Sequence, residues 1–259
     1  MRIISIANQK GGVGKTTLTS LLAFYLADKR RARVLAVDLD SQRNLTHTLR
    51  RFAAGIPTTA LFEGSPVALP ANGEAITLVH GTAALANLER ATAAEAHARV
   101  QRFGAQLRAL DGSFDYCLLD PPPTLGIRMV AALSSAGYVM MPIELEEYST
   151  QAVKDMLQTV YGIRQQWNPH LKFLGMIANR YTHNSVRQKA ALKDLLENYA
   201  AYILPAKISS RTAIPRALEE GCGVGALGTA AGREASLEVE GAFERLLQAM
   251  EPAPARAAG

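Results

Sequence analysis

Two lysines and three glycines near residue 10 have the types and the spacing of a phosphate-binding loop. The string is Lys10-Gly11-Gly12-Val13-Gly14-Lys15-Thr16-Thr17. Glycines let the backbone turn its N–H groups inward around phosphate oxygens, and the positive end of a following helix adds to the attraction. Lys15 would place its charge on the β- and γ-phosphates, and the Thr16 hydroxyl suits Mg²⁺. We expect all eight residues to bind nucleotide; a glycine-rich turn without a ligand is the structural alternative.

Acidic side chains stand at the ends of two apolar runs, where a parallel sheet collects its ligands. Asp120 ends the run 114–120 and has the place of a Walker B acid, which holds Mg²⁺ through a water molecule. Asp40 closely follows the run 33–38 and is our candidate both for orienting the attacking water and for the metal site. Helix capping is the structural alternative for both residues, and a solvated acid is a further one for Asp40.

The rest of the chain alternates apolar runs with helical patterns, which predicts an α/β fold of the P-loop NTPase type, mostly parallel, with helices on both faces. Strands are expected at 3–7, 33–38, 76–80, 114–120, 138–143, 171–178 and 201–204. Helices are expected at 16–30, 87–109, 125–136, 150–167, 185–200, 212–220 and 230–250. Residues 41–75 are rich in glycine and proline and are expected to be irregular. One domain over 1–251 is the simplest organisation, with a disordered Pro/Ala-rich tail at 252–259.

Several motifs together resemble those of the ParA/MinD family of ATPases. Gln9 stands where the ordinary phosphate-loop pattern has glycine, and the added Lys10 gives the string the form of that family's deviant Walker A motif. The segment 38–44 resembles the switch I string D-x-D-P-Q-x-N, and 120–126 resembles the switch II region. Segments 175–180 and 203–205 look like the pair that frames adenine. The resemblance runs from residue 1 to about 250 and looks closest to plasmid partition ATPases of the short IncC/ParA type.

Three residues depart from the family pattern. Ser41 replaces a usual proline in switch I, Arg43 replaces a small residue, and Pro121 takes a slot that is usually small or polar. None of these changes removes a group that the chemistry requires. They bear on the rate of hydrolysis more than on nucleotide binding.

The resemblance implies a switch driven by ATP and Mg²⁺, with weak basal hydrolysis. Lys10 would reach the partner's nucleotide in an ATP-dependent homodimer, so that Lys10, Lys15 and Asp40 carry the reaction. Asn179, Arg180 and Pro205 would bind the nucleotide base. The dimer would bind double-stranded DNA without sequence preference, and a ParB-type centromere-binding protein would stimulate hydrolysis and release it. Such a protein is cytoplasmic and nucleoid-associated.

Charge supports a nucleic-acid partner. The formal net charge is +5, yet residues 1–51 hold 10 Lys/Arg against 3 Asp/Glu, and residues 151–215 hold 9 against 3. Two basic blocks on an otherwise acidic chain could form an electrostatic footprint for DNA, although ordinary solvated helix faces would look the same. The candidate DNA contacts are Arg211, Lys207, Lys189 and Lys193. Arg211 has the position of a basic residue that is implicated in DNA contact in the family.

Other classes of protein fit less well. There is no apolar run long enough to span a membrane, and two isolated cysteines give neither a disulfide framework nor a cluster site. A membrane-bound ATPase of the MinD kind would need a basic amphipathic C-terminal helix, whereas 230–250 is acidic. A repressor would need an operator-binding domain before the first strand. Two alternatives stay open: a positioning ATPase of the same superfamily with a non-DNA cargo, and a binding module that ATP merely dimerises. The plasmid or chromosomal origin is not encoded in these patterns.

Overall fold

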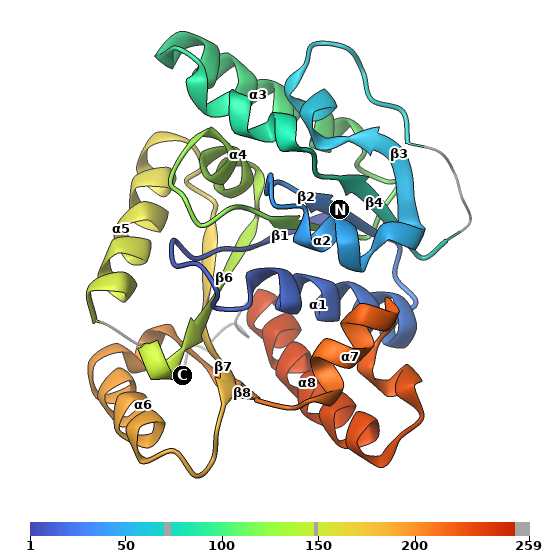
Figure 1. Cartoon of the computed structure of the whole chain (residues 1–259). Helices are drawn as coiled ribbons and strands as arrows, with labels where there is room; N and C mark the ends of the chain where they lie inside the picture. Colours follow the sequence, from blue (N-terminus) through green and yellow to red (C-terminus); the bar gives the residue numbers. More distant parts are fainter. Residues whose placement is uncertain (70–73, 148–149, 252–259) are drawn as a thin grey trace, which may run out of the picture.

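The computed structural model describes residues 1–69, 74–147 and 150–251, so the predicted tail 252–259 lies outside the described residues. Within these ranges eight strands form one sheet in the order β3-β4-β2-β5-β1-β6-β7-β8, and every neighbouring pair is parallel (Figure 1). The strands are β1 Arg2–Ile6, β2 Val34–Asp38, β3 Ala53–Pro57, β4 Ile76–His80, β5 Tyr116–Asp120, β6 Tyr138–Glu144, β7 Lys172–Tyr181 and β8 Ile203–Ser209. The predicted α/β class is confirmed.

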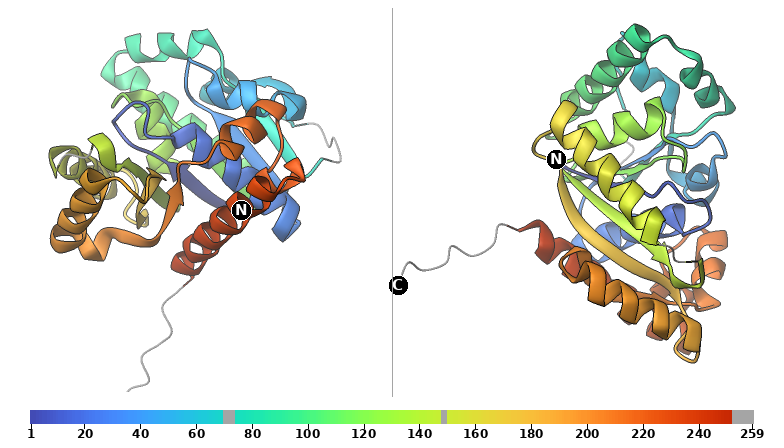
Figure 2. Two further views of the ribbon diagram at one scale, coloured as in Figure 1. Left: turned by 60° about the horizontal axis from the view of Figure 1, so that its bottom comes forward. Right: turned by 90° about the vertical axis from the view of Figure 1, so that its left-hand side faces the viewer.

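Helices cover both faces of this sheet (Figure 2). Helices α1 Lys15–Arg30, α7 Ala213–Glu220 and α8 Ala230–Met250 share a core on one face, beside the short α2 Asn44–Thr48. The other face packs against α3 Ala93–Ala109, α4 Ile127–Ser135, α5 Thr150–Gln166 and α6 Val186–Tyr199. In β2, Val34 and Ala36 face the first core while Leu35 and Val37 face the second, as the two-residue period of a strand requires. Central strands buried on both sides therefore read as continuous apolar runs.

The strand order explains where a ligand must bind. Strands β2, β5 and β1 are direct neighbours, and all three end at the same edge of the sheet. In the register, Asp38 lies opposite Asp120 at the ends of β2 and β5. The loop between β1 and α1 leaves the sheet at the same edge, so three segments distant in sequence meet there (Figure 1).

Some predicted boundaries were wrong. The helix expected over 87–109 is a 3-10 segment, Ala83–Arg90, followed by α3, because Thr92 and Glu95 form a capping box that starts a new helix. The irregular stretch 41–75 contains α2 and the edge strand β3, where Pro57 is tolerated because an edge strand leaves one side unpaired. The strand expected at 201–204 runs instead over 203–209.

Candidate nucleotide-binding site

The phosphate loop has the backbone conformation that its glycines predict. Gly12 and Gly14 have φ of 80° and 91°, in the left-handed region that L side chains rarely adopt. A Cβ atom on Gly14 would lie 2.1 Å from the Asn179 side-chain nitrogen. In the described part of the chain, no hydrogen bond uses the N–H groups of residues 11–14. These donors are available to an anion at the N-terminus of α1.

Asn8 fixes the start of the loop. Its side chain is buried, donates to the Pro142 carbonyl at 2.8 Å and accepts from the Lys10 backbone N–H at 2.9 Å. The asparagine thereby ties the loop to β6. Sequence reasoning missed this residue, although its place directly after the first strand was a signal for a site role.

Lys15 lies inside the loop with its ammonium group turned back on the backbone. Only 7% of the residue is exposed, and its Nζ donates to the Lys10 carbonyl at 3.0 Å. Burial lowers the pKa of the Lys15 ammonium, while the charges of Asp120 and Asp40 act in the opposite direction. A buried ammonium group that lines a cleft is suited to bind an anionic ligand there.

The side chains of Asp120 and Thr16, the two residues of the predicted metal site on β5 and α1, are in direct contact. The Thr16 hydroxyl donates to Asp120 Oδ2 at 2.6 Å, and the Thr19 hydroxyl approaches Oδ1 at 3.5 Å. Burial, reinforced by the neighbouring Asp38, raises the pKa of Asp120 to about 8. The site is therefore short of positive charge, which Mg²⁺ would supply; Thr16 and Asp120 are a hydroxyl and a carboxylate of the kind that Mg²⁺ accepts.

The described ranges contain no group of three or more His, Cys, Asp or Glu side chains that could hold a metal on its own.

Asp38 organises the segment that carries Asp40. The fully buried Asp38 carboxylate accepts from the Asp40 N–H at 3.0 Å and from the Thr46 N–H and hydroxyl at 2.8 and 2.6 Å. Burial raises the pKa of Asp38, although these hydrogen bonds favour its charged form. Asp40 itself is half-buried, accepts from the Gln42 N–H at 3.0 Å and lines the cleft. Its predicted helix-cap alternative does not apply, because the N-cap of α2 is Arg43.

The cleft around the loop has a volume of about 460 Å³ and brings together most of the predicted nucleotide-binding residues. It is lined by Gly11, Gly12, Gly14, Lys15, Thr16, Thr17, Asp40, Gln42, Asn44, His47, Thr48, Pro123, Arg180 and Leu218. The sequence did not single out His47, Thr48 or Leu218, because α2 and α7 are brought to the cleft by tertiary packing, which includes contacts of both helices with α1.

A second cavity of about 380 Å³ adjoins the first, since Thr17, His47 and Arg180 are among the residues that line both. Asn179 and Arg180 of β7, which were predicted to bind the nucleotide base, both line this second cavity. Asn179 donates to the Val13 carbonyl at 3.0 Å, and Arg180 donates to the Gly12 carbonyl at 3.2 Å. Arg180 also lies 3.6 Å from the Glu144 carboxylate. These hydrogen bonds attach the end of β7 to the loop. The rest of the second cavity is lined mainly by Ser209–Thr212 and Pro215.

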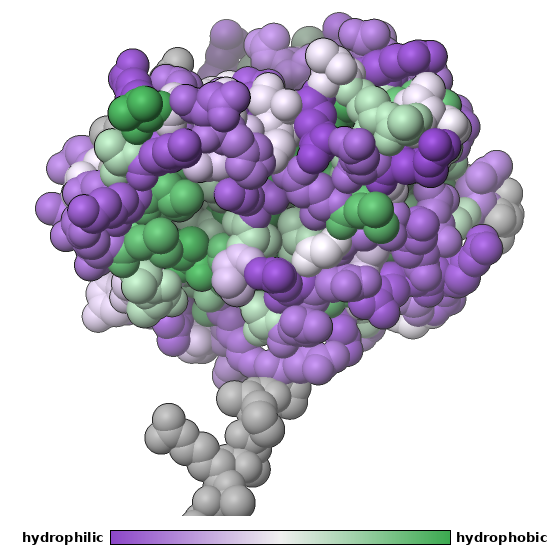
Figure 3. Space-filling model, turned by 90° about the horizontal axis from the view of Figure 1, so that it is seen from below, coloured by the Kyte–Doolittle hydropathy of each residue, from purple (hydrophilic) through white to green (hydrophobic). Residues whose placement is uncertain are grey.

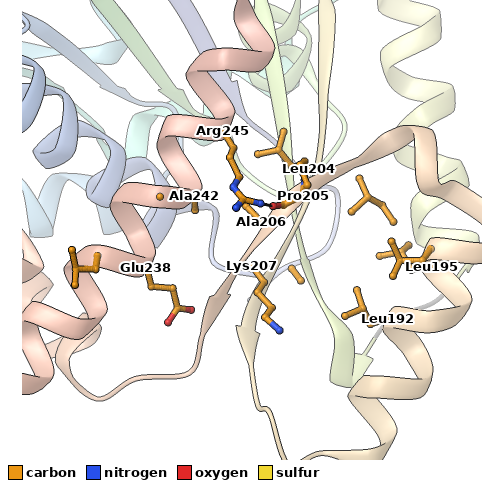
Figure 4. Close-up of a pocket in the computed structure, with 14 residues that line it drawn as sticks. Leu192, Leu195, Leu204, Pro205, Ala206, Lys207, Glu238, Ala242 and Arg245 are labelled. Carbon is orange, nitrogen blue, oxygen red and sulfur yellow. Dashed lines mark hydrogen bonds between the residues drawn. The ribbon is translucent and has the colours of Figure 1, made fainter.

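Pro205 is the predicted site residue that the structure does not bring to the loop. It lies within β8, four residues before the carboxyl end, because this strand runs to Ser209 rather than to residue 204. Pro205 lines a different hollow of about 490 Å³ between α6, β8 and α8, and none of the loop residues contributes to it (Figure 4). Apolar side chains gather in this hollow on the face seen from below (Figure 3). The cavity next to the loop is lined instead by Ser209–Thr212 and Pro215.

The predicted DNA contacts lie on α6 and at β8. Lys189 and Lys193 are exposed on α6, and Lys193 lies 3.7 Å from Glu197. Lys207 Nζ lies 4.2 Å from the centre of the Tyr181 ring, a cation–π arrangement. Arg211 is more constrained: Nε donates to Glu238 at 2.8 Å, and Nη1 donates to Glu234 at 3.1 Å. Its charge is thus partly neutralised within the chain.

Across the described ranges, no helix combines the length and the apolar character needed to cross a membrane.

Comparisons with known proteins agree with the geometry. The family model that matches residues 1–173 is described as an AAA domain. The chain is 38% identical to Protein IncC of Escherichia coli over 261 residues, which cover 97% of this chain and 70% of IncC. It is also 38% identical to chromosome-partitioning ATPase Soj of Thermus thermophilus over 186 residues, 70% of each chain. Among solved structures, cobyrinic acid a,c-diamide synthase of Mycobacterium smegmatis with bound ATP analogue and magnesium is similar, with 26% identity, a TM-score of 0.72 and 98% of each chain covered.

Proposed function

The chain belongs to the ParA-type partition ATPases, and from this premise we propose that it segregates DNA by cycling between an ATP-bound, DNA-bound dimer and a released form. It is a P-loop ATPase that uses ATP and Mg²⁺. What we propose beyond this is the DNA cargo, the homodimer, the ParB-type partner and the role of each site residue.

The observation that carries the proposal is the two-lysine loop together with the two acids, Asp40 and Asp120, that lie beside it. Lys15, Thr16 and Asp40 line the cleft around the loop, and Asp120 is hydrogen-bonded to Thr16. We assign the β- and γ-phosphates to Lys15 and the loop N–H groups, and Mg²⁺ to Thr16, Asp120 and Asp40. When bound, Mg²⁺ supplies positive charge against the charge that develops on the transferred phosphoryl group. Residues 11–14, Thr17, Asn179 and Arg180 complete the nucleotide site.

Asp40 orients the attacking water in this proposal, since phosphoryl transfer depends on positioning and charge stabilisation rather than on a strong base. Lys10 heads the loop, with its backbone N–H held by Asn8. We assign its side chain to the nucleotide of the second subunit, so that ATP links the two copies. One subunit offers DNA a single basic surface, and a sandwich dimer offers two, so dimerisation doubles the number of phosphate contacts. DNA binding should therefore require ATP.

The test is duplex DNA binding by the protein with ATP and with ADP, from 50 to 200 mM salt. We expect binding in ATP only, without sequence preference, and with a steep salt response of about 0.9 in the log–log slope per phosphate contact. Turnover is then measured with DNA and the product of a neighbouring ParB-like gene, which should accelerate it.

Each alternative gives a different result in the same experiment. A positioning ATPase with a non-DNA cargo would hydrolyse ATP but bind DNA equally weakly in both nucleotides. A module that ATP merely dimerises would bind DNA in ATP without turnover. A flat salt response would mean that Lys189, Lys193 and Lys207 belong to an ordinary solvated surface.

A further inference from the structure

Arg128 is a buried cation that the nucleotide site does not use directly. It lies in the first turn of α4, and only 6% of the residue is exposed. A guanidinium group is costly to bury unless its donors are paired and its charge is balanced. The hydrogen-bond partners of Arg128 therefore show which residues stabilise the buried guanidinium group and which segment it fixes in place.

The charge of Arg128 is balanced by Glu89, from the 3-10 segment before α3. Arg128 Nε donates to Glu89 Oε1 at 2.8 Å, and Glu89 Oε2 accepts from the Ile127 N–H at 2.8 Å. The carboxylate lies so close to the chain that a Cβ atom on Gly126 would be 2.2 Å from Oε2. Glu89 thus caps the start of α4 and sets the direction of the Arg128 side chain.

The other end of the guanidinium reaches the segment that carries Asp40. Arg128 Nη1 donates to the Leu39 carbonyl at 3.3 Å and approaches the Ser41 hydroxyl at 3.5 Å. Ser41 is the residue that replaces the usual proline of this segment, and its hydroxyl adds to the contact.

These contacts fix one peptide group from both sides. The Leu39 carbonyl and the Asp40 N–H belong to the same planar peptide unit. Arg128 binds the carbonyl, while the Asp38 carboxylate binds the N–H at 3.0 Å. Because that unit leads directly into Asp40, its orientation determines where the Asp40 side chain points.

We propose that Arg128, held by Glu89, is a positioning residue for ATP hydrolysis that aims the Asp40 carboxylate into the cleft. The inference rests on the proposed role of Asp40.

Arginine is required because two separate acceptors must be reached from one planar group. Lysine keeps the charge but has a single nitrogen, which cannot bind Glu89 and the Leu39 carbonyl in the same geometry. Arg128→Lys should therefore lower the single-turnover rate of hydrolysis about tenfold while leaving ATP affinity unchanged. Glu89→Gln should give a loss in the same direction, since the amide cannot accept at both oxygen positions.

The decisive test is a double-mutant cycle with Asp40→Ala, measured by single-turnover hydrolysis of labelled ATP. If Arg128 acts through Asp40, Arg128→Lys should have little further effect once Asp40 is absent. The exposed Arg102→Lys on α3 serves as the control, and thermal unfolding shows that each variant is folded.

Three results would overturn the proposal: an unchanged rate in Arg128→Lys, an equal loss from Arg128→Lys with and without Asp40, or a weakened ATP affinity. The equal loss would leave the role of Asp40 intact and refute only its positioning by Arg128. If Asp40→Ala alone hydrolyses ATP like the parent protein, the proposed role of Asp40 fails, and the inference about Arg128 fails with it.

Discussion

At the scale of single residues, the two lysines of the loop differ in their surroundings. Lys15 is buried and donates to the backbone carbonyl of Lys10, whereas Lys10 is half-buried at the head of the loop. A ligand that replaces the carbonyl as the partner of Lys15 would bind within the same subunit. The two side chains should therefore contribute to different steps.

Lys15→Ala should weaken ATP binding about a hundredfold, because a charge-assisted contact to phosphate is lost inside the cleft. Lys10→Ala should leave ATP affinity unchanged and abolish ATP-dependent dimerisation and hydrolysis. Nucleotide titration and dimer mass would be measured for both variants. A Lys10→Ala protein that dimerises and hydrolyses like the parent would refute the contact across the interface.

Asp40→Ala should trap the ATP-bound dimer, because the variant loses the water-orienting carboxylate but keeps the phosphate loop. We expect turnover to fall about a hundredfold, in the range found for positioned acid and base groups, with ATP-dependent DNA binding retained. The measurements are ATP turnover with and without the ParB-type partner, and DNA binding in ATP. Undiminished stimulated turnover would exclude Asp40 from the reaction.

At the scale of elements, the loop between β1 and α1 is locked to the end of β7. Asn179 and Arg180 donate to the Val13 and Gly12 carbonyls, so the loop is held from outside as well as by its own glycines. The loop conformation therefore depends on contacts from another strand, and a side chain added at the crossing point should disturb it.

Gly14→Ala should distort the loop, since the new Cβ would meet Asn179 at a residue with φ of 91°. Such strain costs about 1–3 kcal/mol, and ATP affinity should fall at least tenfold. Gly162→Ala is the matched control: it lies in α5 with open space around a Cβ, and should raise stability by up to about 1 kcal/mol. Thermal unfolding and ATP titration compare the two. Equal effects of both changes would contradict the close contact.

At the scale of the whole molecule, the predicted DNA-binding cations are not equivalent. Arg211 is paired with two glutamates of α8, while Lys189 and Lys193 project from α6 at the other side of β8. Glu238 also accepts from the Ser209 N–H and is tied into the fold, whereas the Glu234 side chain is 70% exposed. Arg211 can reach a phosphate most readily if it exchanges Glu234 for DNA.

This exchange predicts opposite effects for two substitutions. Arg211→Ala should weaken ATP-dependent DNA binding and reduce the salt slope by about 0.9 per lost contact, with ATP binding and dimerisation intact. Glu234→Gln should strengthen DNA binding, because it frees part of the Arg211 guanidinium and removes a negative charge. DNA titrations at several salt concentrations test both, with Arg102→Ala on α3 as the control. If Glu234→Gln binds DNA like the parent, Arg211 is a structural cation of the α8 contact.

Local patterns in the sequence were enough to predict a phosphate loop and the class of the fold. Glycine, lysine and threonine at fixed spacing specify a phosphate loop locally, because backbone conformation and side-chain type act over a few residues. The apolar run that ends in Asp120 and the alternation of strands and helices are equally local signals. In the structure the Thr16 hydroxyl donates a hydrogen bond to Asp120.

Which distant segments line the cleft depends on the tertiary structure. The end of β8 is set by its pairing with β7, so Pro205 lies within the strand, and Ser209–Thr212 line the cavity beside the loop. The Glu89–Arg128 pair could not be found at all from sequence, since both residues lie in ordinary helical patterns. The pair stands out only because it is buried: charged groups inside a protein need hydrogen-bond partners, and the fold supplies these from segments that are distant in sequence.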